Sequence, residues 1–194
     1  MTKEKRGKTY QLAACAVMAA VICVLAPLSV PIGPVPISLG TLAIYLTVCL
    51  LGWKWGTISC VVYLVLGFAG VPVFAGYTGG LAKLVGPTGG YLVGYIPLAL
   101  ISGLVIEYAC RHMMGRGKNR TALALILQFV GMVAGTAVLY ALGTAWFCIL
   151  SGNALGYALG ACVTPFIPFD LLKMVVALVI AAPVRARLEK AKLI

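Results

Sequence analysis

The single aspartate of the chain lies three residues before a lysine, inside an apolar segment. Asp170 and Lys173 belong to the stretch Pro-Phe-Ile-Pro-Phe-Asp-Leu-Leu-Lys at 165–173. Side chains three residues apart share one face of a helix, so the carboxylate and the ammonium group can pair. A charge at membrane depth costs at least about 2.5–3.5 kcal/mol on insertion scales, and it is tolerated when it is paired and faces the interior of a bundle. The spacing therefore indicates either a structural ion pair or a site for a polar ligand.

These two interpretations explain different parts of the pattern. A helix that begins near residue 165, with Pro168 in its first turn, would favour the charge of Asp170 through its dipole. The same positive helix end disfavours Lys173, which needs an accepting group nearby. Asp170 supplies part of that requirement, and a ligand would supply the rest. Because ionisable residues within membrane spans are functional by default, we expect a ligand site.

A glycine-rich segment, Gly-Pro-Thr-Gly-Gly-Tyr-Leu at 86–92, follows Lys83 closely. Glycine allows a backbone to approach a ligand, and Thr88 and Tyr91 offer directional polar contacts. The segment is not a phosphate loop, which needs Gly-Lys followed by Ser or Thr. We predict that Thr88, Gly89, Gly90 and Tyr91 contact a ligand. A flexible turn with small residues for helix packing is the alternative.

The other titratable residues assemble neither a catalytic nor a metal site. The single histidine, His112, lies on a basic flank, and Glu107 stands four residues before Arg111, a spacing that favours an ion pair. The seven cysteines include no CxxC pair, and most lie in apolar runs, where a thiol behaves as a small hydrophobic group. We therefore expect no enzyme, no metal and no covalently bound cofactor.

Membrane-spanning helices must position these residues. Of the 194 residues, 62% are hydrophobic and 10% charged, whereas soluble domains carry about 25% charged residues. The sequence predicts an all-α integral membrane protein, with one domain over 1–194 and six transmembrane helices. We expect the helices at 10–26, 41–52, 57–70, 90–110, 121–150 and 165–182. The second and third are shorter than the roughly 20 residues that a crossing needs, and are expected to extend into their flanks. Two Pro/Gly-rich stretches, at 27–40 and 71–89, separate the first span from the second and the third from the fourth.

Basic residues are distributed unequally across this arrangement. Thirteen of the fifteen Lys and Arg residues fall on one side, Lys83 falls on the other, and Lys173 lies inside the last span. The positive-inside rule makes the segments 1–9 and 185–194 cytoplasmic in a multi-pass protein of the cell membrane. The net charge of +11 reflects this topology, and without interleaved aromatic residues it does not indicate nucleic-acid binding.

Small residues four apart occur in two spans. Ala16 and Ala20 lie in the first, and Gly131 and Gly135 lie in the fifth. This spacing lets another helix approach closely. Packing inside the bundle and contact with a partner protein explain it equally well.

Together these features resemble the BioY family, the biotin-binding S components of energy-coupling factor (ECF) vitamin transporters. The resemblance extends from about residue 10 to 187 and rests on the motifs at 86–92 and 165–173. The alanine-rich first span and the stretch Pro-Ile-Gly-Pro-Val-Pro-Ile-Ser-Leu-Gly-Thr at 31–41 also contribute. It implies an S-component-like six-helix bundle with an outward-opening biotin pocket, roofed by the segments before the second and fourth helices.

The resemblance also implies partners. S components of this kind associate with a transmembrane T component and two ATPase subunits, and Ala16 and Ala20 match the helix face that makes this contact. Such a subunit, which has no ATPase site of its own, is thought to topple in the membrane and so carry its vitamin inward.

Biotin suits the residues described above. Its ureido ring offers two N–H donors and one carbonyl acceptor, so Asp170 can accept from an N–H group while Lys173 donates to the carbonyl. Tyr91 can cover the rings, and Lys83 can meet the tail carboxylate. An S component for another water-soluble vitamin, a small intramembrane enzyme that uses Asp170 and a purely structural membrane partner are the alternatives. The enzyme lacks a second catalytic group at comparable depth, and the structural partner leaves the ion pair unexplained.

Overall fold

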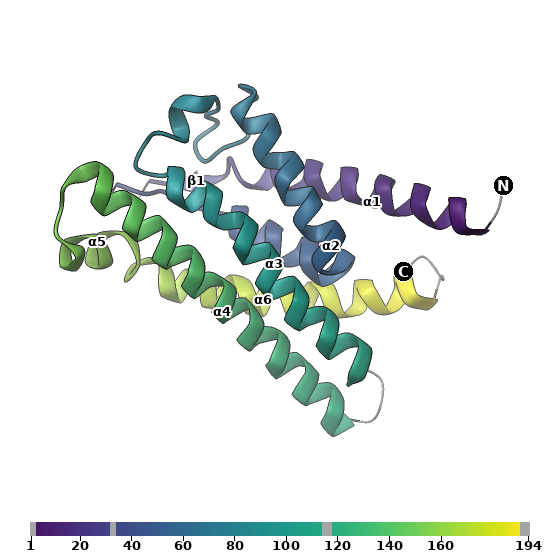
Figure 1. Ribbon diagram of the computed structural model, residues 1–194. Coiled ribbons are helices and arrows are strands. Elements are labelled where there is room, and N and C mark those ends of the chain that lie inside the picture. The colour runs from purple at the N-terminus through teal and green to yellow at the C-terminus, as the bar shows by residue number, and fades with distance from the viewer. Residues whose placement is uncertain (1–2, 32–33, 114–117, 191–194) are drawn as a thin grey trace.

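The computed structural model describes residues 3–31, 34–113 and 118–190. Within these ranges it contains six α-helices, one 3-10 turn and a two-stranded antiparallel sheet (Figure 1). In order they are α1 (Lys3–Leu25), β1 (Ser29–Val30), β2 (Ile37–Ser38), α2 (Gly40–Phe68), the turn η1 (Leu81–Lys83), α3 (Gly89–His112), α4 (Lys118–Ser151), α5 (Leu155–Cys162) and α6 (Phe166–Lys190). Over the described residues, α2, α3, α4 and α6 are long and apolar enough to cross a membrane, and α1 contributes a shorter apolar helix. The predicted fold class, an all-α membrane protein, is confirmed.

The helix α2 bends sharply at Gly52. This residue has φ 75° and ψ −175°, a conformation that is essentially restricted to glycine. Beyond the bend, a Cβ on Gly56 would lie 3.0 Å from Cα of Val48, although the two residues would be about 12 Å apart along a straight helix. The two halves of α2 therefore fold back against each other. They correspond to the predicted second and third spans, without the separating segment at 53–56 that the prediction implied.

The other predicted spans correspond to α1, α3, α4 and α6. The helices α3 and α4 extend beyond both predicted limits, α1 extends only at its start and α6 only at its end. Three elements were not predicted. The short helix α5 lies between α4 and α6, the β1–β2 hairpin lies inside the Pro/Gly-rich stretch at 27–40, and the turn η1 lies inside the stretch at 71–89. Within the terminal segments 1–9 and 185–194, α1 starts at Lys3 and α6 runs to Lys190, whereas residues 1–2 and 191–194 lie outside the described ranges.

The elements divide between two ends of the molecule. Both described chain ends, the bend of α2, the end of α3 and the start of α4 lie at one end, which we call the terminal end (Figure 1). The β1–β2 hairpin, η1 and α5 lie at the other, which we call the hairpin end. Two basic residues of the predicted cytoplasmic side, Arg116 and Lys192, are outside the described residues.

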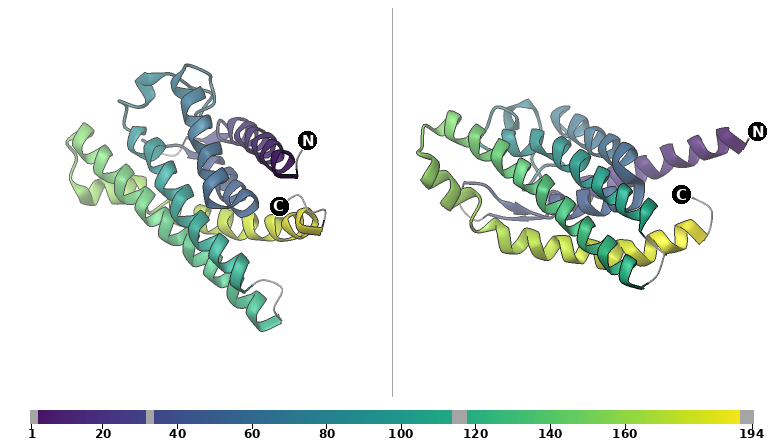
Figure 2. Two further views of the ribbon diagram at one scale, coloured as in Figure 1. Left: turned by 45° about the vertical axis from the view of Figure 1, so that its right-hand side comes forward. Right: turned by 60° about the horizontal axis from the view of Figure 1, so that its bottom comes forward.

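The helices α3 and α4 run side by side along their lengths (Figure 2). Gly131 and Gly135 make this close approach possible. A Cβ on Gly135 would lie 3.0 Å from the carbonyl oxygen of Leu98, and one on Gly131 would overlap the side chain of Val105. The glycine pair of the fifth predicted span therefore packs inside the bundle.

An aromatic side chain anchors the loop 69–88, which joins α2 to α3. Phe74 is 2% exposed, and its ring makes edge contacts with the rings of Tyr63 and Phe68, at centroid distances of 5.7 and 5.2 Å. Both partners belong to the second half of α2, so this half of the helix holds the loop at the hairpin end.

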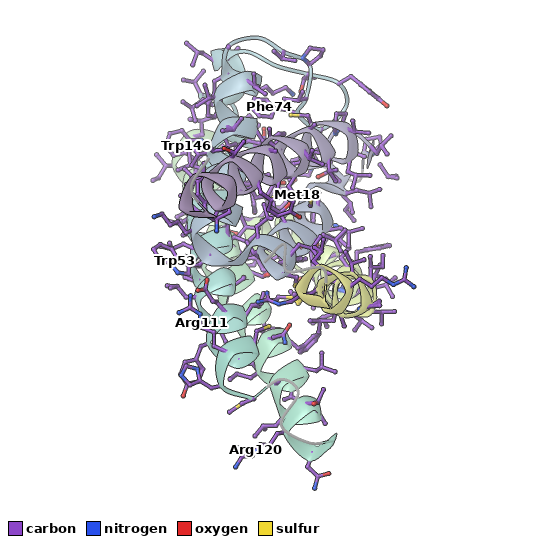
Figure 3. All side chains as sticks on the ribbon, turned by 90° about the vertical axis from the view of Figure 1, so that its right-hand side faces the viewer. Met18, Trp53, Phe74, Arg111, Arg120 and Trp146 are labelled. Carbon is purple, nitrogen blue, oxygen red and sulfur yellow. The ribbon has the colours of Figure 1, made fainter. Side chains whose placement is uncertain are left out.

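Two hydrogen bonds tie the same loop to other elements. The amide of Gly76 donates to the carbonyl of Pro27, at 3.0 Å, next to β1. Nε1 of Trp146 on α4 donates to the carbonyl of Gly86, also at 3.0 Å. The side chains of Phe74 and Trp146 are both labelled in Figure 3. The loop therefore has defined neighbours on α2, α4 and the hairpin.

Candidate functional site

Asp170 and Lys173 form a buried ion pair on α6. Nζ of Lys173 lies 2.9 Å from Oδ1 of Asp170, and the two residues are 8% and 3% exposed. The helix begins at Phe166, so both side chains stand within its first two to three turns at the hairpin end. Their three-residue spacing places them on one face, directed into the bundle.

Groups from three other elements complete the hydrogen bonds of this pair. The hydroxyl of Thr41 on α2 donates to Oδ1 of Asp170 at 3.0 Å, and the hydroxyl of Tyr140 on α4 donates to Oδ2 at 2.6 Å. Nζ of Lys173 donates to the carbonyl of Ser38 at 2.8 Å and to Oγ1 of Thr41 at 3.1 Å. We call these five residues the Asp170 cluster. Sequence reasoning identified only its two charged members.

The junction between β2 and α2 supplies two members of the cluster because it turns tightly. Oγ of Ser38 accepts the amide of Gly40 at 3.2 Å, which leaves the Ser38 carbonyl for Lys173. A Cβ on Gly40 would lie 3.2 Å from the hydroxyl of Tyr95 and 3.3 Å from Cβ of Ala26. Glycine therefore lets the start of α2 sit against α3 and the end of α1.

Two small compartments lie between α3 and the segment 35–38, which includes β2. The first, of about 40 Å³, reaches Asp170, Lys173, Thr41 and Tyr140, and we call it the cluster compartment. The second, of about 50 Å³, reaches the loop, and we call it the loop compartment. They are neighbours, since both are lined by Val35, Pro36, Ser38, Tyr91 and Tyr95.

The chemistry of this region changes along its length. The cluster compartment ends at a carboxylate and an ammonium group, the shared wall presents tyrosine rings and apolar side chains, and Lys83 lines the loop compartment. Each compartment is much smaller than the roughly 300–1,000 Å³ of typical ligand pockets. A ligand that fills a pocket of typical size can therefore bind only if the residues between the two compartments move apart. The layout suits an elongated guest with a polar head, an apolar body and an anionic tail.

The predicted contact residues occupy different places in this layout. Lys83 and Thr88 line the loop compartment, and Tyr91 lines both compartments. The hydroxyl of Tyr91 lies 3.3 Å from Oγ1 of Thr144 and donates to the carbonyl of Cys162 at 3.4 Å. The hydroxyl is thus engaged within the protein, and the ring is the part of Tyr91 available to a guest.

Gly89 and Gly90 do not belong to the lining of either compartment. A Cβ on Gly90 would overlap the side chain of Trp146, and one on Gly89 would overlap the backbone of Leu84. Both glycines allow the start of α3, which carries Tyr91, to pack tightly. Their contact with a ligand stays a prediction.

Ala16 and Ala20 are exposed on α1. The neighbouring face of this helix, with Cys15, Ala19 and Ile22, is buried and packs towards α2. The small-residue face at Ala16 and Ala20 is therefore not used for packing among the described elements. Its role in partner contact stays a prediction.

Comparison with known proteins agrees with this architecture. The model of the BioY family matches residues 1–190. A biotin transporter BioY from Thermotoga maritima is 38% identical over 171 residues, covering 88% of this chain and 93% of that protein. A probable biotin transporter BioY from Pyrococcus horikoshii is 36% identical over 174 residues, covering 90% and 95%.

The fold has a solved counterpart as well. A crystal structure of the S-component for biotin from an ECF-type ABC transporter matches with a TM-score of 0.80 and 31% identity, covering 96% of this chain and 95% of that one. Both the sequence match and the structural match extend over almost the whole chain, and the chain therefore belongs to the BioY family.

Proposed function

We propose that this protein is the substrate-binding subunit of an ATP-driven ECF-type importer and that its substrate is biotin. Membership of a transporter family supports the class of activity. The observation that carries the assignment of the site is the buried Asp170–Lys173 pair at the end of a tyrosine-lined cavity. This geometry supports a binding site, and the proposed activity involves no chemical change in the ligand.

In the proposed complex the ureido ring of biotin meets the Asp170 cluster. The carboxylate of Asp170 accepts a ureido N–H group, and Nζ of Lys173 donates to the ureido carbonyl in place of one of its three acceptors within the protein. The rings of Tyr91 and Tyr95 cover the fused bicycle. The tail extends into the loop compartment, where Lys83 attracts its carboxylate. A charge-assisted hydrogen bond at each end fixes the orientation of the guest.

Energy for import comes from other chains in this proposal. A transmembrane T component and two ATPase subunits form the remainder of the transporter, and the T component contacts α1 at Ala16 and Ala20. The exposure of these two alanines supports the contact, because small residues four apart let a second helix approach closely in the membrane.

The proposed orientation places the terminal end in the cytoplasm and the hairpin end outside. The distribution of Lys and Arg along the sequence supports it. The Asp170 cluster and the loop 69–88 then lie towards the outer side, where the vitamin arrives.

Titration of the purified, detergent-solubilised protein with biotin and a panel of other water-soluble vitamins tests the proposal. We expect tight binding of biotin only, and a loss of about 10- to 150-fold in affinity in Asp170→Asn, since a hydrogen bond to a charged group contributes about 1.5–3 kcal/mol. Asparagine keeps the shape of the side chain, so thermal unfolding should still be cooperative. Lys54→Gln is a matched control at the terminal end and should bind as the parent does. Parental affinity in Asp170→Asn would disprove the ureido assignment, and tighter binding of another vitamin would disprove the substrate.

Co-purification tests the partner contact. Ala16→Leu adds bulk to the exposed face of α1 and should reduce recovery of the ATPase subunits with the tagged protein. Ala134→Leu, an exposed position on α4, makes the same change elsewhere and should leave recovery unchanged. Equal recovery from both variants would place the contact on another surface.

A further inference from the structure

A cleft of about 450 Å³ opens at the terminal end, far from the Asp170 cluster. It is lined by residues of α1, the bend of α2, α3 and α6. Three cationic side chains take part, namely Lys54 at the bend, Arg111 at the end of α3 and Arg185 on α6, together with Trp53 and Trp55. The proposed biotin site gives this cleft no role.

The cleft carries an excess of positive charge. Glu107 is the only acidic residue of its lining, which leaves a net charge of +2 from three cations and one anion. Glu107 already has partners, since it pairs with Arg111, as the spacing predicted, and its Oε2 accepts the amide of Trp53 at 3.3 Å. The side chain of Arg111 is nevertheless 70% exposed, and Lys54 is exposed as well.

The backbone adds to this positive potential. The second half of α2 begins directly after Gly52, so the N-terminal turn of a helix contributes Trp53, Lys54 and Trp55 to the cleft. The N-terminus of a helix favours anions through its dipole and its amides. Arg185 is held in place from the other side, because its Nη1 donates to the carbonyl of Cys49 at 2.8 Å.

We propose that this cleft binds the phosphate group of an anionic phospholipid. Basic pockets between transmembrane helices on the cytoplasmic side recognise such headgroups, and tryptophan side chains prefer the headgroup level of the membrane. A phosphate there meets Lys54 and Arg111, and the acyl chains continue along the apolar surfaces of the neighbouring helices. Free phosphate has the same chemistry but gains nothing from those surfaces or from the two tryptophans. Figure 3 looks onto the terminal end, where Trp53 and Arg111 lie on one side and Arg120 lies farther away.

Native mass spectrometry of the delipidated protein in detergent tests the proposal. The probes are phosphatidylglycerol and phosphatidylcholine with identical acyl chains, and inorganic phosphate. We expect the parent to retain phosphatidylglycerol in clear preference to phosphatidylcholine. Lys54→Gln with Arg111→Gln should weaken phosphatidylglycerol binding by about tenfold or more, because each basic residue near a membrane surface contributes about fivefold. Arg120→Gln with Arg187→Gln removes two exposed basic residues outside the cleft and should change nothing.

The remaining outcomes decide against the proposal. Equal retention of the two lipids by the parent would disprove the proposed lipid site. Unchanged retention of phosphatidylglycerol in the Lys54 and Arg111 double variant would disprove it as well. Displacement of phosphatidylglycerol by inorganic phosphate at equal concentration assigns the cleft to free phosphate. Lys54→Gln alone, an exposed position, keeps the test decisive if the double variant unfolds. Biotin titration of the same variants is a separate readout, so the lipid site and the vitamin site can fail independently.

Discussion

The Asp170 cluster shows how two charges are accommodated in a lipid-embedded bundle. Moving an ion from water into a protein interior costs several kcal/mol even after relaxation. Here the carboxylate receives an ammonium group and two hydroxyls, and the ammonium group also reaches a backbone carbonyl. Removing one charge leaves the other buried without its counter-charge, whereas removing both leaves only neutral polar groups. The pair is therefore a coupled unit.

This coupling predicts a difference between single and double variants. Lys173→Met should lower the free energy of unfolding by about 3–5 kcal/mol, the usual cost of breaking a buried pair. Asp170→Asn combined with Lys173→Met should recover most of that loss, while neither variant binds biotin. Thermal unfolding, followed by tryptophan fluorescence, measures the change in stability. Calorimetric titration measures biotin binding. Additive losses in the double variant would show that the two charges do not interact.

The contacts of Tyr91 predict that its ring contributes to biotin affinity and that its hydroxyl does not. Its hydroxyl is bonded to Thr144 and to the carbonyl of Cys162, so Tyr91→Phe should change biotin affinity by less than about threefold. Tyr91→Ala should weaken it by about tenfold or more, because burial of a large apolar group contributes about 1.5–3 kcal/mol. Equilibrium titration of both variants provides the measurement. A large loss in Tyr91→Phe would mean that the hydroxyl itself contacts the guest.

The sequence predicts some members of the site and not others, for a physical reason. Asp170 and Lys173 stand out because charges are rare in apolar segments and each needs a partner. Thr41 and Tyr140 carry no such signal, since hydroxyl side chains occur in many spans. They lie 129 and 30 residues from Asp170, and only the packing of α2 and α4 against α6 brings them to it.

At the scale of elements, the bend of α2 determines how the site is built. Because α2 reverses at Gly52, its first half can present Thr41 to α6 while its second half presents Tyr63 and Phe68 to the loop 69–88. One glycine thus lets a single helix supply both a hydroxyl of the Asp170 cluster and the aromatic rings that hold the loop 69–88.

Replacing this glycine should be costly. Gly52→Ala forces a side chain into a glycine-only conformation, and its Cβ would lie 2.6 Å from Oε2 of Glu107. We expect a loss of roughly 1–3 kcal/mol in the free energy of unfolding, seen as a lower thermal midpoint. Gly156→Ala on α5 is the control, since its added Cβ meets nothing within 4 Å and alanine favours a helix. Equal midpoints for the parent and Gly52→Ala would contradict the strained bend.

Helices with long apolar runs can be predicted from the sequence, whereas short glycine-rich elements cannot. The segments at α3, α4 and α6 each form an apolar helix of at least 20 residues, long enough to identify a span. The helix α5 has eight residues, two of them glycine, which is too short and too rich in glycine for periodicity to reveal it. The β1–β2 hairpin is equally short, and its two strands are defined by pairing rather than by any apolar run.

At the scale of the whole molecule, the exposed basic residues and the buried Asp170 cluster lie towards opposite ends. The basic residues near the bend of α2 and the end of α3 lie at the terminal end, and the Asp170 cluster lies towards the hairpin end. The cleft proposed for the phospholipid and the compartments proposed for the vitamin therefore lie towards opposite ends of the molecule.

Reporter fusions test this orientation. Green fluorescent protein fused after residue 194 should fluoresce, and alkaline phosphatase fused there should be inactive, because the proposed orientation places the terminal end in the cytoplasm. Alkaline phosphatase fused after Asn153, between α4 and α5, should be active. The reverse pattern would invert the topology and place the vitamin site on the inner side.

The seating of Phe74 against Tyr63 and Phe68 has a kinetic consequence. Phe74 and Lys83 line the same compartment, so widening it to release a guest means withdrawing a fully buried ring at a cost of about 1.5–3 kcal/mol, with the aromatic contacts adding to it. That cost acts as a latch on the exit route. We therefore expect the residence time of bound vitamin to depend on how often the ring of Phe74 leaves its contacts, and to shorten in Phe74→Ala.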